Sequence, residues 1–385
     1  MKKSINRREF LKITASAGAA LSLSALLPDS AVRAAEIGAK NGTMIADRRT
    51  NDGMPQRTLG TGRAALTVSA MGFGCMGMNH HRGQHPDKRT MIRLLQQAAD
   101  EGVTLFDTAE SYGPWVNEEL VGEALHSRRH DVCITTKFGH TFVDGRHNIG
   151  VEDCSPENIR RVCEASLRRL NIEAIPLFYQ HRQDKNVPVE VVAETVAELI
   201  EEGKVLHFGL SEANADTIRR AHVVCPVTAV ESEFHLMWRT PAQTVFPTLQ
   251  ELGIGFVAYS PLTRGFLGGN LNDQMTFDAD NDNRATHGQF TREALRANTP
   301  ILNELYRFGR TRGMTAAQVA LAWMTTKYPF LVAIPGTTKR AHMLENNAAL
   351  DFQLTAEEIA ELEQVVSAYP VAGERANLRD TSIQK

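Results

Sequence analysis

The chain has 385 residues, of which 42% are hydrophobic and 23% charged, and its formal net charge is −3. This is ordinary globular composition, and the length allows one large domain or two smaller ones. No basic stripe is interleaved with aromatic residues, which argues against a nucleic-acid-binding protein. The five cysteines are odd in number and lack metal-ligand spacing, so we expect buried or free thiols rather than a disulfide framework.

The N-terminus has the pattern of an export signal. Arg7 and Arg8 precede a modestly apolar stretch rich in Ala, Gly and Ser, and small residues offer a cleavage site after Ala34. The pattern resembles a twin-arginine signal, which carries folded proteins across the bacterial inner membrane. A chance arginine pair before an amphipathic helix and an uncleaved anchor are the alternatives, although the stretch is short for a membrane span. We predict a signal peptide at 1–34, the twin-arginine export machinery as a partner, and a periplasmic location, with the cytoplasm as the alternative.

A polar segment at 35–55 is predicted to be a flexible linker, and a regular pattern begins at Gln56. The segments 57–59 and 66–69 flank a glycine-containing turn and predict a β-hairpin. Eight short apolar runs then alternate with amphipathic segments of helical period. The strand-like runs are 70–74, 104–108, 132–137, 176–180, 206–210, 228–232, 255–259 and 331–334. The helical segments include 90–101, 117–125, 156–170 and 189–202.

Strict alternation of strands and helices indicates parallel strands with helical crossovers. An open doubly wound sheet and a closed barrel both satisfy this pattern. The count of eight and a span of about 265 residues favour the barrel, and no Gly-x-Gly-x-x-Gly motif opens the first helix. We therefore predict an α/β protein, a (β/α)8 TIM barrel with an N-terminal β-hairpin, over 56–368, followed by a C-terminal tail at 369–385.

Four polar residues fall at the ends of consecutive predicted strands, where the functional groups of such barrels gather. Asp107, Tyr112, Lys137 and His181 could together protonate a carbonyl oxygen while a cofactor supplies hydride. A lysine ammonium stabilises a phenolate and lowers the pKa of a tyrosine. Singly, each residue has a structural explanation, such as a rim aromatic, a bridging ion pair or a core histidine. The combination on one rim favours catalysis.

The segments that contain these residues resemble those of the aldo-keto reductase superfamily, most of all its bacterial, plant and potassium-channel-β-like branches. The resemblance extends over about 310 residues and rests on Asp107-Thr108-Ala109, Ser111-Tyr112-Gly113, Thr136-Lys137 and Tyr179-Gln180-His181-Arg182. It implies that Tyr112 is the proton donor, that Asp107 and Lys137 tune it, and that His181 orients the carbonyl.

The resemblance also implies NADPH/NADP+ as cofactor and assigns residues to each of its parts. The nicotinamide end would contact Ser211, Glu212, Glu231 and Tyr259, with Tyr259 stacking on the ring. The pyrophosphate loop would comprise Pro261, Leu262, Arg264 and Gly265, and the adenosine end would bind Gly336, Thr337, Thr338, Lys339, Glu345 and Asn346. Hydroxyls, a cation and a helix N-terminus suit a phosphate dianion.

Three residues depart from the family pattern. Glu231 replaces a usual Gln and, if ionised, would favour the oxidised, positively charged ring. Thr263 replaces a common Gly in the pyrophosphate loop, and His342 stands where an Arg often clamps the adenosine end. None of the three belongs to the catalytic four.

Two further segments lie on the same predicted rim. We expect no metal at His80, His81 and His85, because a site needs further convergent ligands. The segment 268–289 is long for a βα loop and predicts either a lid over the cofactor or a mobile insertion.

The function that the resemblance implies is NADP-dependent interconversion of aldehydes or ketones and alcohols, with small-molecule carbonyl substrates. The alternative is a cofactor-loaded redox-sensing or binding protein resembling the potassium-channel β subunits.

Overall fold

The structure of the protein is a computed structural model that describes residues 53–375. The predicted signal peptide and nearly all of the predicted linker lie outside the described residues. Within the described part of the chain, no helix is long and apolar enough to cross a membrane.

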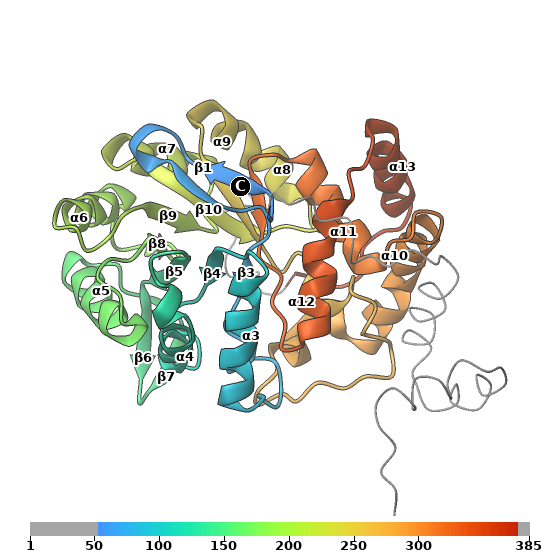
Figure 1. Ribbon diagram of the computed structural model, residues 1–385, viewed down its shortest axis with the longest axis horizontal. Helices are drawn as coiled ribbons and strands as arrows, with labels where there is room; N and C mark the ends of the chain where they lie inside the picture. Colours follow the sequence, from blue (N-terminus) through green and yellow to red (C-terminus); the bar gives the residue numbers. More distant parts are fainter. Residues whose placement is uncertain (1–52, 376–385) are drawn as a thin grey trace, which may run out of the picture. The chain divides into compact units, whose positions relative to one another are not determined.

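Eight parallel strands form the central sheet, in the order β12-β11-β10-β9-β8-β5-β4-β3 (Figure 1). Their bounds are β3 Phe73–Gly74, β4 Leu105–Asp107, β5 Cys133–Phe138, β8 Leu177–Gln180, β9 Phe208–Ser211, β10 Val227–Glu233, β11 Gly255–Tyr259 and β12 Leu331–Ala333. A parallel bridge between Met71 and Ala333 joins the two edges, with the amide of Gly72 donating to the carbonyl of Ala333 at 2.8 Å. The predicted (β/α)8 barrel is therefore confirmed.

The predicted N-terminal hairpin is also confirmed, as β1 (Gln56–Leu59) paired with β2 (Leu66–Ser69). Its Leu59 and Val68 are buried with the inward-facing residues of the barrel strands. A side chain at Gly255 is excluded, since its Cβ would lie 2.4 Å from Cδ2 of Leu59. The hairpin thus packs against the barrel interior, and its Leu59 lies so close to β11 that only glycine fits at position 255.

Helices surround the strands (Figure 1). They are α3 Lys88–Asp100, α4 Val116–Leu125, α5 Pro156–Leu170, α6 Val189–Glu201, α7 Ala215–Val224, α8 Thr240–Thr244, α9 Phe246–Leu252, α10 Arg292–Arg310, α11 Ala316–Lys327, α12 Arg340–Asn347 and α13 Ala356–Ser367. Local sequence explains several of their starts. Ser155 caps α5 by accepting from the amide of Asn158, with Pro156 in the first turn, and Thr315 and Thr355 open α11 and α13 with complete capping boxes.

One element was not predicted from the sequence. The antiparallel hairpin β6 (His140–Val143) and β7 (Arg146–Glu152) is inserted between β5 and α5. Because it directly follows β5, it lies at the carboxyl ends of the barrel strands, the side on which the candidate catalytic residues stand.

A buried ion pair joins α4 to α5 outside the barrel. Glu118 is fully buried, its Oε1 accepts from the Thr136 hydroxyl at 2.7 Å, and its Oε2 accepts from Nε of Arg169 at 2.6 Å.

We expect Arg169→Leu to lower the free energy of unfolding by about 3 kcal/mol, because it leaves a buried carboxylate without its cation. Urea denaturation measures this difference. The neighbouring exposed Arg168→Leu is the control and should stay within about 0.5 kcal/mol of the wild type; equal effects of the two variants would refute the pairing argument.

Candidate active site

Strand ends bring the four predicted catalytic residues to one rim. Asp107 is the last residue of β4, Lys137 lies in β5, and His181 follows β8 directly, while Tyr112 lies in the turn that leads into α4. The registers place Asp107 beside Thr135 and Lys137 beside Tyr179 on neighbouring parallel strands. The polar groups therefore converge at the carboxyl ends of β4, β5 and β8.

Lys137 is the centre of this site and is fully buried. Its Nζ lies 2.6 Å from both carboxylate oxygens of Asp107 and donates to the carbonyl of Thr108 at 2.9 Å. The hydroxyl of Thr135 in turn donates to Oδ2 of Asp107 at 2.7 Å. Burial lowers the pKa of Lys137, but the carboxylates of Asp107 and Glu231 outweigh burial and hold this pKa above its ordinary value. The lysine is thus a fixed cation at neutral pH.

Glu231 adds a second carboxyl group to the same lysine. Its Oε2 lies 3.4 Å from Nζ of Lys137, farther than the oxygens of Asp107. Burial, and then the negative charge of Asp107, raise the pKa of Glu231 to about 8, while Lys137 opposes the shift. Glu231 is therefore mostly protonated at neutral pH, and the effect expected of its ionised form on the oxidised ring arises only in alkaline solution.

The raised pKa of Glu231 predicts a pH-dependent stability. A carboxyl whose pKa is about 8 when folded and 4.5 when unfolded costs no stability below pH 4.5, and its cost grows as the pH rises toward 8. Glu231→Gln removes that cost. We expect it to change stability little at pH 5 and to raise the unfolding free energy at pH 8, relative to the wild type, by roughly 1–3 kcal/mol. Urea titrations at both pH values test this, with the exposed Glu201→Gln as control; a difference that does not change with pH would contradict it.

Tyr112 stands next to the lysine with its side chain partly exposed at the mouth of the barrel. Its hydroxyl oxygen lies 3.5 Å from Nζ of Lys137, at the outer limit of a hydrogen bond. Burial of the hydroxyl raises the pKa of Tyr112 above its ordinary value; Lys137 lowers this pKa, as expected from the sequence, but only in part. The phenol is therefore protonated at neutral pH and available as a proton donor.

His181 faces Tyr112 edge to face, with ring centroids 6.0 Å apart. Burial lowers the pKa of His181 well below its ordinary value, and the neighbouring His140 and Arg182 lower it further. The imidazole is neutral, and its Nδ1 is buried without a hydrogen-bond partner among residues 53–375. A neutral imidazole can donate one hydrogen bond to a carbonyl oxygen without competing for its proton.

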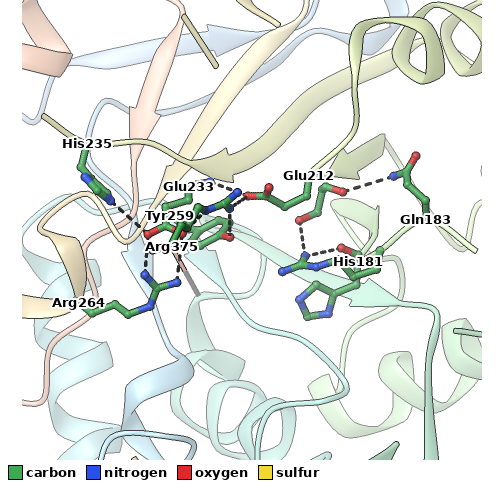
Figure 2. Close-up of polar contacts among 10 residues, drawn as sticks. His181, Gln183, Glu212, Glu233, His235, Tyr259, Arg264 and Arg375 are labelled. Carbon is green, nitrogen blue, oxygen red and sulfur yellow. Dashed lines mark hydrogen bonds and ion pairs between the residues drawn. The ribbon is translucent and has the colours of Figure 1, made fainter. Parts of the chain in front are cut away.

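The residues predicted for the nicotinamide end lie on or directly after the next three strands, and Figure 2 shows two of them, Glu212 and Tyr259. Ser211 ends β9 and pairs with Glu231 across the sheet, and its hydroxyl accepts from Nη1 of Arg182 at 3.1 Å. Glu212 comes next, with a left-handed φ of 54° and an amide that donates to the carbonyl of Glu231 at 2.9 Å. Such a strained backbone is typical of functional sites.

Tyr259 ends β11 beside Glu233, the last residue of β10. Glu233 is a fully buried carboxylate that sequence reasoning missed. It accepts from Nη1 of Arg264 at 2.6 Å and from Nε of Arg375 at 2.7 Å. Burial raises the pKa of Glu233, but Arg264 and its other polar neighbours hold it well below the usual range.

The predicted pyrophosphate loop is a tight turn. Pro261 follows Ser260, the amide of Thr263 donates to the carbonyl of Ser260 at 2.8 Å, and Gly265 donates to the carbonyl of Leu262 at 3.0 Å. Thr263 and Arg264 both have left-handed φ values, 49° and 50°. This conformation gives the physical reason why glycine suits the position of Thr263.

Three guanidinium groups converge beside this loop. Burial, and then the charges of Arg264 and Arg284, lower the pKa of Arg82 to about 9. Arg82 comes from the segment after β3 and donates to the side chain of Asn283. Two of the three groups have carboxylate partners, because Arg264 donates to Oε1 of Glu233 at 2.6 Å and Arg284 donates to Oδ1 of Asp282 at 2.9 Å. No motif in the sequence pointed to Arg82.

The long segment 268–289 connects the loop after β11 with the residues that follow β3. There, Asp282 forms an antiparallel bridge with Arg82 and Asn281 accepts from the amide of Gly83 at 3.1 Å. Two short 3-10 turns, η6 (Asn283–Thr286) and η7 (Gly288–Phe290), shape its end. These contacts hold the end of the segment to the residues that follow β3, and the choice between a lid and a mobile insertion stays a prediction.

The residues predicted for the adenosine end gather around the start of α12. Gly336 packs so closely on Gly74 that an added Cβ would lie 2.7 Å from the carbonyl oxygen of Gly74. The exposed Lys339 is the residue before α12, and its amide donates to the hydroxyl of Thr337 at 3.1 Å, with Thr338 between them. One turn further on, His342, Glu345 and the buried Asn346 lie on the helix, and burial lowers the pKa of His342.

Histidines line the mouth around Tyr112. His80 stacks on Tyr112 at 5.7 Å between ring centroids, and His140 of the unpredicted hairpin lies 4.3 Å from His181 and 4.1 Å from His147. No group of side chains within residues 53–375 has the arrangement of a metal site.

Comparison with known proteins places this geometry in a family. The Aldo/keto reductase family matches residues 70–367, so the chain belongs to the aldo-keto reductases. A glycerol dehydrogenase from Gluconobacter oxydans is similar at 25% identity and a TM-score of 0.74, over 83% of this chain and 98% of that one. An aldo-keto reductase from Klebsiella pneumoniae, solved with NADPH, is 26% identical with a TM-score of 0.62, over 82% and 96% of the two chains. Another structure from that organism, with NADP and acetate, gives 26% and 0.62 over 84% and 99%.

Proposed function

We propose that this oxidoreductase interconverts aldehydes or ketones and alcohols with NADPH/NADP+, and that Tyr112 is the proton donor in the direction of reduction. The observation that carries the proposal is the fixed, buried ammonium of Lys137, which is held by Asp107 and lies 3.5 Å from the Tyr112 hydroxyl. An ammonium in this place stabilises the phenolate that remains after the proton has left.

The chain's own groups would act on the carbonyl oxygen. When bound, the cofactor supplies a hydride to the carbonyl carbon. The carbonyl π electrons then form the new O–H bond with the Tyr112 proton, and the phenolate recovers a proton from solvent after the alcohol leaves. The neutral imidazole of His181 is placed to hold the carbonyl oxygen by a hydrogen bond.

The same rim supports the choice of cofactor. Related structures contain NADPH and NADP, and here the converging guanidinium groups of Arg82, Arg264 and Arg284 fit a pyrophosphate. In addition, Lys339 and the hydroxyl of Thr337 fit a 2′-phosphate. Ser211 and Glu212 would hold the carboxamide and Tyr259 the ring face.

The test is consumption of NADPH by the purified protein over a panel of aldehydes, with Tyr112→Phe as the matched variant. Steady turnover with equal amounts of alcohol and NADP+ formed is the expected result. Tight cofactor binding without turnover on any carbonyl would instead favour the redox-sensing alternative, and absence of cofactor binding would refute both.

We also propose that the protein is exported by the twin-arginine machinery and acts in the periplasm. The proposal rests on Arg7, Arg8 and the short apolar stretch that follows them. Fractionation of cells that produce the full chain should place it in the periplasm, and Arg7→Lys together with Arg8→Lys should retain it in the cytoplasm. A cytoplasmic wild-type protein would overturn the proposal without affecting the proposed chemistry.

A further inference from the structure

The last described residues, 369–375, return to the mouth of the barrel. Two hydrogen bonds fix their path: Nδ2 of Asn298, in α10, donates to the carbonyl of Ala372 at 2.9 Å, and the amide of Ala372 donates to Oδ1 of Asn298 at 2.8 Å. Gly373 has φ of 84° and packs so tightly that an added Cβ would lie 2.4 Å from the carbonyl oxygen of Gly288. We call residues 371–375 the C-terminal strap.

The side chain of Arg375 is the part of the strap that contacts the candidate active site. Its side chain is only 7% exposed, and Figure 2 shows it between three polar groups of the rim. Nη2 donates to Oε1 of Glu212 at 2.6 Å and to the hydroxyl of Tyr259 at 3.1 Å, while Nε donates to Oε2 of Glu233 at 2.7 Å. The guanidinium also lies over the ring of Trp238, 5.1 Å from its centroid. A single side chain thus joins the ends of β9, β10 and β11.

Two of these partners, Glu212 and Tyr259, are residues assigned above to the nicotinamide end of the cofactor. Arg375 already bonds one carboxylate oxygen of Glu212 and the hydroxyl of Tyr259, so a ligand that binds these atoms must first displace Arg375. No strap residue is held by the apolar interior of the barrel, and a cavity lies beside the strap, lined in part by Met237, Trp238 and Gln289. The strap can therefore move without unpacking the core.

Resting on the proposed function, we propose that the C-terminal strap is a gate over the nicotinamide end of the cofactor site, latched by Arg375 to Glu212 and Glu233. The gate opens for cofactor to enter or leave and closes behind it. The latch consists of charge-assisted hydrogen bonds, which are stronger than hydrogen bonds between neutral groups and therefore slow the exchange of cofactor.

The test measures cofactor exchange directly, by stopped-flow fluorescence of NADPH binding to and release from the full chain. Arg375→Gln removes the latch, and Asn298→Ala loosens the strap at a distance without changing any charge. We expect both variants to raise the association rate and the release rate together, by about tenfold or more. Arg310→Gln is the control, since it removes one positive charge from the exposed end of α10 and should leave both rates unchanged.

Other outcomes overturn the gate. A faster release with unchanged association would make Arg375 a simple binding residue, and a faster association with unchanged release would make the strap a competitor of the cofactor. Unchanged rates in both variants, with a wild type that binds and turns over NADPH, would refute the gate and leave the proposed function intact. A wild type that binds no NADPH would remove both. Hydrogen exchange gives a second readout, since the amide of Ala372 should be protected in the wild type and exposed in Asn298→Ala.

Discussion

Tyr112→Phe is expected to lower the rate of carbonyl reduction by about 10²- to 10⁴-fold, the range that a positioned proton donor contributes. The substitution removes one oxygen and leaves the edge-to-face contact with His181 and the partly exposed position of the ring. Lys137 keeps its bonds to Asp107 and to the carbonyl of Thr108. We therefore expect unchanged stability and an unchanged dissociation constant for NADPH, with the loss confined to kcat.

The matched control is Tyr179→Phe. Tyr179 also faces the lysine, with Nζ of Lys137 5.9 Å from its ring centroid, but its hydroxyl is buried without a partner among the described residues. Removing an unsatisfied hydroxyl should leave activity intact and stability equal or slightly higher. Steady-state kinetics of both variants decide the matter: a Tyr112→Phe enzyme that stays within tenfold of the wild type would exclude Tyr112 as the donor.

The sequence predicted the barrel because each of its strands is a short apolar run bounded by turn residues, and it predicted the position of the catalytic rim for the same reason. Asp107, Lys137 and His181 are separated in sequence by 30 and 44 positions, yet a parallel barrel brings strand ends together whatever the length of the helices between them. The local sequence pattern and the barrel topology were therefore sufficient to predict that these three residues lie on one rim.

Other parts of the site depend on contacts that no local pattern carries. In the hairpin β6–β7, histidines and a threonine stand at positions where a half-buried strand usually alternates apolar and polar residues. The sequence pattern therefore does not predict strands there. Glu233 is one charged residue at the end of an apolar strand, and Arg375 is one arginine in a polar tail. The two residues form an ion pair although 142 positions of sequence separate them, and this pairing can be seen only in the folded chain.

Lys137→Met is expected to abolish turnover and also to destabilise the protein by about 3–5 kcal/mol, the cost of leaving a buried charge without its partner. Methionine fills much of the space of the lysine stem, so that the loss comes from charge rather than from a cavity. Asp107 would keep as hydrogen-bond partners the hydroxyl of Thr135 and the side chain of Glu231. Urea denaturation and steady-state turnover give the two effects separately.

Double variants show which carboxyl group bears the cost. Asp107→Asn combined with Lys137→Met should regain most of the lost stability and none of the activity, because the buried charge has been removed but the ammonium is still missing. Glu231→Gln combined with Lys137→Met should regain little, because the pKa of Glu231 is already raised to about 8 and the group is mostly neutral at pH 7. Rescue by Glu231→Gln rather than by Asp107→Asn would reverse this assignment and make Glu231 the counter-ion of the lysine.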